Sequence, residues 1–175
     1  MNNEELKKVA HDLLVHHPSR GVTPAALTDV LMSLSINEFQ HDELICKEGE
    51  SGDRMFFLLY GSARVTRKDA NGKERELVTI SAPALFGHMA LVDNSPRSAT
   101  CVAAGTTRVA PLERGLYNTM LSESSPRGTA LRRMLLTSLT QQLENATGRL
   151  RKLIKDGEDK SDTGEDNART NQTEH

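Results

Sequence analysis

The stretch Leu85–Thr100, LFGHMALVDNSPRSAT, decides how the rest of the sequence is interpreted. It places Gly87 before a short apolar segment and Arg97 after a polar turn. A short helix that begins at Gly87 would point its unpaired backbone N–H groups at an anion in front of it. The planar guanidinium of Arg97 suits the oxygens of a phosphate. Together these residues predict a small anion-binding site on a β scaffold.

Short runs with strand-like composition lie on both sides of this stretch. Asn71 and Gly72 supply the positive φ angles that a hairpin turn needs, so the runs on either side of them are typical of paired strands. The predicted strands are 38–46, 55–60, 64–68, 74–80, 99–104 and 107–112. Short strands at this spacing, with turn signals between them, indicate a mainly β fold, either a sandwich or a barrel.

Helical patterns flank the predicted strands. Apolar residues recur at helical spacing over 4–15, while Thr23 and Pro24 offer the cap and the first residue of a second helix. A short helix is expected over 112–121 and a long one over 129–154. Apolar residues in the long helix recur at alternating steps of three and four, as in a coiled-coil seam: Leu136, Leu139, Leu143, Ala146, Leu150 and Leu153. This seam favours a parallel contact between two protomers, and packing on the barrel is the alternative.

The spacing from Gly87 to Arg97 resembles that of the phosphate-binding cassette of cyclic nucleotide-binding domains. The run 47–53, followed by 55–61, is similar to the strand-turn-strand signature of the same family. The resemblance covers residues 27–143. It implies a jelly-roll β-barrel of the type found in catabolite activator protein, with N-terminal helices and a long C-terminal helix.

The resemblance also assigns a ligand-binding role to individual residues. Arg97 corresponds to the residue that pairs with the cyclic phosphate, and Ser98 to a neighbour that adds a hydrogen bond. Gly87 corresponds to a backbone donor at the start of the helix. The full set of residues that the resemblance places in or around the pocket is Val78, Leu85, Gly87, His88, Met89, Ala90, Arg97 and Ser98.

The sequence departs from the family pattern at His88, where the family places a glutamate. The resemblance implies that this glutamate binds the ribose 2′-hydroxyl and orients the arginine, whereas a neutral imidazole supplies no charge. Losing a charge-assisted hydrogen bond costs roughly 1.5 to 3 kcal/mol, about tenfold to a hundredfold in affinity. Two alternatives stay open. The pocket is retuned for another phosphate ligand, or it no longer binds one and survives as a scaffold.

The sequence divides into four expected segments. They are an N-terminal helical segment (1–36), a β-barrel with the cassette at 85–100 (37–112), C-terminal helices that include a dimerisation helix (113–155), and a disordered acidic tail (156–175). The tail stands where a transcription factor of the family would begin its helix-turn-helix domain. It lacks the apolar residues for two such helices, so DNA is not expected as a partner.

Composition restricts the classes of function further. The 175 residues carry a net charge of −2, which gives no general attraction to nucleic acid or to membranes. No apolar run could span a bilayer and no signal peptide is evident, so a cytoplasmic location is expected. Cys46 and Cys101 lie in strand-like runs, where reduced core residues are the commoner case. No metal-ligand spacing and no nucleophile with a nearby base is present, so neither a metal nor an enzymatic activity is expected.

These features predict a stand-alone, non-enzymatic sensor of the cyclic nucleotide-binding type. We expect a homodimer formed through the 129–154 helix, with a ligand-induced shift of that helix passed to an unidentified effector protein. No cofactor is expected apart from a cyclic nucleotide or related phosphate ligand. The alternative is a degenerate domain that binds no nucleotide and serves as a constitutive interaction or dimerisation scaffold.

Overall fold

The computed structural model describes the backbone of residues 1–165 and the side chains of residues 1–155. The chain divides into two compact units, Met1–Ser138 and a second unit that begins at Leu139. The expected segments 1–36 and 37–112 therefore belong to one unit, and the expected segment 113–155 is divided at Ser138. All candidate ligand-binding residues lie in the first unit.

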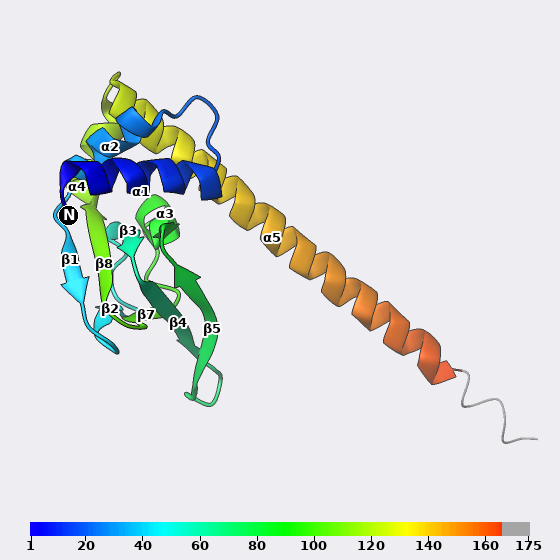
Figure 1. The fold of residues 1–175 in the computed structure, drawn as a ribbon. Coiled ribbons are helices and arrows are strands. Elements are labelled where there is room, and N and C mark those ends of the chain that lie inside the picture. The colour runs from blue at the N-terminus through cyan, green and yellow to red at the C-terminus, as the bar shows by residue number, and fades with distance from the viewer. Residues whose placement is uncertain (166–175) are drawn as a thin grey trace, which may run out of the picture. The chain divides into compact units, whose positions relative to one another are not determined.

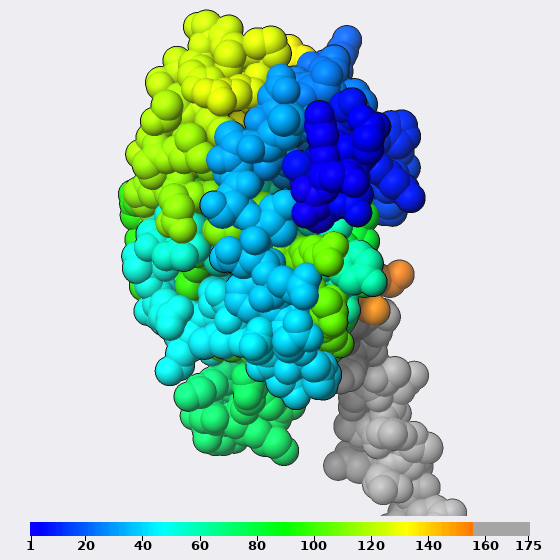
Figure 2. Space-filling view, turned by 60° about the vertical axis from the view of Figure 1, so that its left-hand side comes forward, coloured from blue at the N-terminus to red at the C-terminus, as the bar shows by residue number. Residues whose placement is uncertain are grey.

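Eight short strands form the scaffold of the first unit. They are β1 (Asn37–Phe39), β2 (Leu44–Cys46), β3 (Arg54–Tyr60), β4 (Ser62–Lys68), β5 (Glu74–Ser81), β6 (Ala84–Phe86), β7 (Thr100–Ala103) and β8 (Thr107–Glu113). One four-stranded sheet has the order β1-β8-β3-β6 and the other the order β2-β7-β4-β5, and every pairing is antiparallel. This is the predicted mainly β architecture of the jelly-roll type (Figure 1). Figure 2 shows the β4–β5 hairpin, in green, at the opposite end of the barrel from the helical residues near 120.

Side chains from both sheets meet inside the barrel. The rings of Phe56 and Phe86 stack with their centroids 5.0 Å apart. The buried members of this barrel core are Cys46, Phe56, Leu58, Ala84, Phe86, Cys101 and Val109. Successive residues of a strand face opposite sides, so the alternate residues Met55, Phe57 and Leu59 of β3 point away from the barrel core. Both faces of β3 are covered, which explains its nearly continuous apolar sequence.

Five helices complete the described chain: α1 (Asn3–His16), α2 (Pro24–Met32), α3 (His88–Asp93), α4 (Arg114–Ser122) and α5 (Pro126–Glu165). At the start of α1, the Asn2 side chain accepts a hydrogen bond from the Glu5 amide, and the Glu5 side chain accepts one from the Asn2 amide. Thr23 caps α2 ahead of Pro24, as predicted. α3 follows β6 directly, so the cassette begins at the edge of the first sheet.

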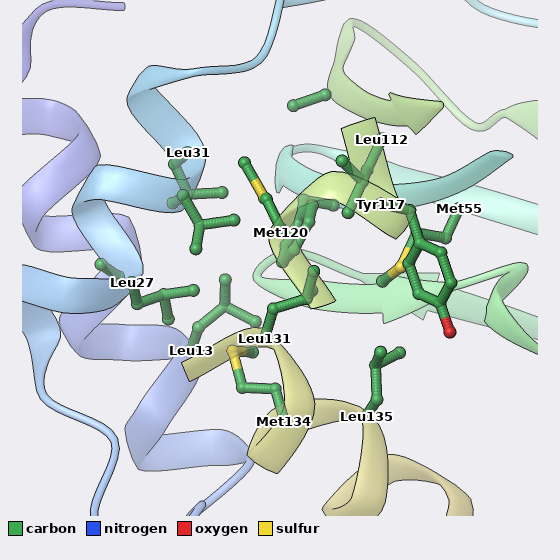
Figure 3. Close-up of a cluster of buried hydrophobic side chains, with 14 of the residues drawn as sticks. Leu13, Leu27, Leu31, Met55, Leu112, Tyr117, Met120, Leu131, Met134 and Leu135 are labelled. Carbon is green, nitrogen blue, oxygen red and sulfur yellow. The ribbon is translucent and has the colours of Figure 1, made fainter. Parts of the chain in front are cut away.

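The helices cover the outer face of the first sheet and form a second cluster, the helical core (Figure 3). Burial of a large apolar side chain stabilises a fold by about 1.5 to 3 kcal/mol, so this cluster fixes the helices on the barrel. The members labelled in the figure are Leu13, Leu27, Leu31, Met55, Leu112, Tyr117, Met120, Leu131, Met134 and Leu135.

Two strand predictions were wrong. The single strand expected over 38–46 is two strands, because the chain turns between them at Gln40, whose carbonyl accepts a hydrogen bond from the Glu43 amide. Asp42 has a positive φ of 65° in the same turn, a conformation that Asp tolerates better than most residues. The strand β6 was missed because it has only three residues, too few to show a periodic pattern.

The last helix is longer than predicted. It was expected over 129–154 and continues to Glu165, through the part of the tail at 156–165 that was expected to be disordered. Extending an existing helix adds one hydrogen bond for each residue fixed, whereas starting one is costly, and a polar sequence can therefore continue a helix. The rest of the predicted tail, 166–175, lies outside the described residues. No helix in the described chain is both long and apolar enough to cross a membrane.

Candidate ligand-binding site

The side chain of Arg97 lies inside the barrel and is only 6% exposed. Its Nη1 donates a hydrogen bond to the Gly87 carbonyl at 2.9 Å, and its Nη2 donates one to the Arg54 carbonyl at 2.6 Å. The guanidinium carbon lies 5.1 Å from the centroid of the Phe56 ring, which adds a cation–π contact. An arginine has five N–H donors, so the side chain is held in place while donors remain for a ligand.

Gly87 makes room for this guanidinium. Its φ is +72°, in the left-handed region that favours glycine. A Cβ atom at this position would lie 2.8 Å from Nη1 of Arg97 and 3.2 Å from Cδ2 of Phe56. The resemblance assigned Gly87 a role as a backbone donor, and the structure shows its carbonyl as an acceptor for Arg97. Glycine is needed here for its conformation and for the space that it leaves.

The loop between β2 and β3 fixes the backbone on either side of Arg97. The Gly49 amide donates to the Arg97 carbonyl at 2.9 Å, and the Arg97 amide donates to the Glu50 carbonyl at 2.8 Å. Ser51 and Pro96 form an antiparallel bridge beside them. The run 47–53 that resembles the family signature therefore holds the end of the cassette.

Arg114 fixes the other part of the cassette and was missed by the sequence analysis. Its guanidinium donates to the carbonyls of Leu91 at 2.8 Å and of Gly52 at 2.9 Å. The last carbonyls of a helix have no partner within the helix, so a cation is favourable at the end of α3. Arg114 belongs to no sequence motif, and only the fold brings it to α3.

Arg97 lines a cavity of about 260 Å³. Its wall residues come from the β2–β3 region and the cassette: Ile45, Cys46, Glu50, Ser51, Asp53, Arg54, Phe56 and Arg97. Arg54 is neutralised by Asp53 at 3.0 Å and by Glu113 at 3.3 Å, and its hydrogen bond lowers the pKa of Asp53. Among the described residues, Arg97 makes no ion pair with a carboxylate. Of the two arginines in the cavity wall, Arg97 is therefore the one that is available to an anion.

His88, which was predicted to be a ligand-binding residue, does not line this cavity. It is 1% exposed and lies against α5, where its Nε2 is 3.0 Å from Oγ of Ser138. Its other ring nitrogen, Nδ1, is buried without a hydrogen-bond partner. Burial, with a smaller contribution from the charge of His17, lowers the pKa of His88 to about 4. The side chain is therefore neutral near pH 7.

Of the predicted pocket residues, only Arg97 lines the cavity. Leu85 faces the helical core, so Phe86, one residue later, faces the barrel interior instead. Ala90 is buried, and a Cβ atom on Gly52 would collide with its side chain at 2.2 Å. The remaining predicted residues are exposed outside the cavity: Val78, Met89 and Ser98.

Some residues of the cavity wall were not predicted from the sequence. Phe56 and Glu50 lie within the two runs that carry the family resemblance, but the resemblance itself does not indicate which of their side chains face inward. For Phe56 a signal was available, since alternate residues of its strand share a face with the barrel core. For Glu50 there was no such signal, because it lies in a turn.

The fold and the buried arginine define a small β-barrel domain with a cavity whose wall contains an arginine. Residues 36–124 match the sequence model of the cyclic nucleotide-binding domain. This chain belongs to the cyclic nucleotide-binding domain family. The cavity and the cassette both lie within the matched residues.

Related proteins include channels and transcription regulators. A cyclic nucleotide-gated potassium channel of Mesorhizobium japonicum is 37% identical over 116 residues, which cover 63% of this chain and 30% of the channel. A CRP-like cAMP-activated global transcriptional regulator of Mycobacterium tuberculosis is 25% identical over 127 residues, which cover 72% of this chain and 56% of the regulator. The chain thus spans less than two thirds of either relative.

Solved structures show the same fold. The catabolite activator protein of Thermus thermophilus superposes with a TM-score of 0.69 and 26% identity, covering 77% of this chain and 62% of that protein. A cyclic nucleotide-binding domain from Methylobacillus flagellatus also has a TM-score of 0.69, with 23% identity, covering 84% of this chain and 81% of that domain. These likenesses confirm the jelly-roll prediction.

Proposed function

We propose that this chain is a non-enzymatic regulatory sensor that binds the cyclic phosphate of a nucleotide in the Arg97 cavity. The observation that carries this proposal is the position of the guanidinium. It is buried, held by two backbone carbonyls, and not paired with a carboxylate of the described chain. A cation that is desolvated and fixed in advance interacts strongly with an anion, because little reorganisation is needed.

The charges of the cavity favour an anion with a single negative charge. Arg97 supplies one unpaired cation, while the carboxylate of Glu50 in the same wall opposes a second negative charge on the ligand. A cyclic phosphodiester carries one negative charge, whereas a phosphomonoester carries about 1.5 to 2 near pH 7. The cavity should therefore prefer 3′,5′-cyclic nucleotides to 5′-monophosphates.

Affinity is expected to be weakened compared with relatives that carry a glutamate at the position of His88. His88 is turned toward Ser138 and supplies neither a charge nor a contact in the cavity. Glu50 is a carboxylate of the cavity wall that makes no ion pair within the described chain, and its one hydrogen bond is accepted from the Lys47 amide. We propose that a hydroxyl of the ligand is placed at Glu50.

We further propose that the signal leaves through α5 and an effector protein. In the second unit, the seam residues Leu143, Leu150 and Leu153 are 68%, 60% and 68% exposed. Apolar side chains repeated at heptad spacing on an exposed helix are typical of a two-helix interface. The proposed homodimer would bury this seam.

A second candidate function is a constitutive scaffold that binds no nucleotide, and the contact between His88 and Ser138 favours it. In this structure the cassette is already attached to α5 by a buried hydrogen bond, and no charge of the ligand is needed to make that contact. In a scaffold, the barrel and helices would serve only to present the seam.

Thermal unfolding with a panel of small anions separates the two functions. The panel contains cyclic AMP, cyclic GMP, 5′-AMP and inorganic phosphate. A sensor is stabilised by a cyclic nucleotide, by about 2.7 kcal/mol when the ligand is at a hundred times its Kd, and less by 5′-AMP. Absence of any shift up to millimolar concentrations supports the scaffold. Equal shifts with cyclic AMP and 5′-AMP contradict the argument from charge.

A further inference from the structure

Cys46 and Cys101 lie directly opposite each other on the antiparallel strands β2 and β7. Both are free thiols, and they are 8% and 6% exposed. The prediction that they are core residues is confirmed, since both belong to the barrel core. Their pairing across two strands was not visible in the sequence, where 54 intervening residues separate them.

One of the two cysteines borders the cavity of the candidate site. Cys46 is part of the wall of the cavity that also contains Arg97, whereas Cys101 is not. A small solute that enters the cavity meets Cys46 without any opening of the barrel. Cys101 lies beside it on the neighbouring strand.

The surroundings make the two thiols chemically different. A hydrogen bond from Cys101 and the charge of Arg97 lower the pKa of Cys46, although burial opposes them. The hydrogen bond with Cys46, together with burial, raises the pKa of Cys101. Thiolates are the nucleophilic form of cysteine, so Cys46 is the more reactive thiol of the pair.

We propose that Cys46 is a peroxide-reactive thiol in the ligand cavity, and that Cys101 is its resolving partner in a cross-strand disulfide. The geometry supports this proposal, since Cys46 lines the cavity and Cys101 is its direct neighbour across the sheet. The positive charge of Arg97, which lines the same cavity as Cys46, also supports it. The oxidant is a hydroperoxide small enough to enter about 260 Å³.

The reaction takes two steps. The Cys46 thiolate attacks the terminal oxygen of the hydroperoxide, the O–O bond breaks, and the leaving alkoxide takes up a proton to become an alcohol. This forms a sulfenic acid on Cys46. The Cys101 sulfur then attacks the Cys46 sulfur, the S–O bond breaks, and the hydroxide leaves as water with the proton from Cys101. In sum, two thiols and one hydroperoxide give one disulfide, one alcohol and one water.

The strands need little movement to close the disulfide. Cβ atoms of directly opposite residues on antiparallel strands are about 4.5 to 5.5 Å apart, and a disulfide needs about 3.5 to 4.5 Å. Cys46 is the last residue of β2, and the pairing register is irregular just before it. The end of a short, irregular strand can move more readily than the middle of a regular one.

The test uses the full chain, treated with stoichiometric hydrogen peroxide and then alkylated after denaturation without reductant. The expected result is loss of both alkylatable thiols, a mass decrease of two hydrogen atoms, and a cross-linked peptide that joins Cys46 to Cys101. In Cys101→Ser the reaction should stop at a sulfenic acid on Cys46 that a dimedone probe traps. In Cys46→Ser the dimedone adduct should be absent.

Other results overturn the proposal. The proposal is wrong if both thiols of the wild-type protein remain alkylatable after treatment. It is also wrong if the only disulfides that form join two chains. Equal dimedone labelling of the two single variants would remove the distinction between an attacking and a resolving thiol. The wild-type measurement needs no substitution, so a variant that fails to fold leaves the proposal testable. No nucleotide is added, so the result does not depend on the proposed ligand.

Discussion

The Nε2 atom of His88, the first residue of α3, lies 3.0 Å from the Oγ atom of Ser138 on α5. This contact connects the cassette to the last helix through a neutral, buried imidazole. The resemblance to relatives places a glutamate here that reaches the ligand. In this chain the residue at that position therefore holds two parts of the protein together and is not part of the cavity wall.

The first prediction concerns stability at acid pH. The pKa of His88 is lowered to about 4 by burial, from an ordinary 6.5, so below pH 6.5 the unfolded chain binds a proton that the folded chain does not. The free energy of unfolding should fall by about 3 kcal/mol between pH 6.5 and 4 from this group alone, and no further below that. Urea unfolding of wild type and His88→Gln across this range measures it.

The glutamine variant lacks the titrating group and should lose less stability on acidification. The matched control is His11→Gln, which replaces an exposed histidine of α1 and should keep the acid dependence of wild type. If His88→Gln and wild type lose stability equally, His88 is not buried as a neutral base.

The second prediction is that His88→Glu exchanges stability for affinity. A carboxylate in this buried position lacks a cationic partner, so the unliganded protein should lose about 1 to 3 kcal/mol of unfolding free energy. We expect a bound cyclic AMP to draw this carboxylate away from Ser138 toward the cavity, where it can accept a hydrogen bond from the ribose, so the nucleotide should bind about tenfold to a hundredfold more tightly. Urea unfolding and calorimetric titration measure the two effects. His88→Gln is the uncharged control, and unchanged affinity in His88→Glu would show that this residue does not limit binding.

The third prediction distinguishes two reasons for a glycine at position 87: its left-handed backbone conformation and the space that it leaves for Arg97. Gly72 has a similar φ of +76°, but a Cβ atom there would have no neighbour within 4 Å. Gly87→Ala and Gly72→Ala should both lose roughly 1 to 2 kcal/mol, because both force a left-handed backbone on alanine. Only Gly87→Ala should also displace Arg97 and weaken cyclic AMP about tenfold. Equal ligand affinity in the two variants would mean that the contact with Arg97 is unimportant.

The fourth prediction concerns the seam on α5. The double variant Leu143→Glu and Leu150→Glu places like charges opposite each other in a parallel dimer, so sedimentation should show monomers where wild type is dimeric. Gln141→Glu changes charge on the same helix but outside the seam, and it should remain dimeric. A wild-type chain that sediments as a monomer at every concentration rules out this interface.

The sequence predicted the fold more completely than the site. The spacing between Gly87 and Arg97 and the loop at 47–53 led to the right family and to a jelly roll with flanking helices. The predicted strand boundaries were wrong where local sequence patterns are weak. The three-residue strand β6 was missed, and the turn around Asp42 was predicted as part of a strand. The predicted end of α5 was too early, because helix extension depends on what precedes a segment as much as on its composition.

The site was harder to predict because long-range contacts determine which way its side chains face. Leu85 and Phe86 are adjacent, and a shift of one residue decides which of them reaches the barrel interior. His88 is turned toward Ser138, which follows it by 50 residues. Arg114 follows β8 directly and reaches α3 through its hydrogen bond to the Leu91 carbonyl. No local pattern carries this information.

The central claim is that the guanidinium of Arg97 binds a cyclic phosphate. Arg97→Lys keeps the positive charge but loses the planar arrangement of donors, and Arg67→Lys makes the same change at an exposed arginine on β4. Calorimetric titration with cyclic AMP should show binding to wild type and to Arg67→Lys, and an affinity at least tenfold weaker for folded Arg97→Lys. Equal affinity in all three proteins, or no heat of binding in any of them, would contradict the claim.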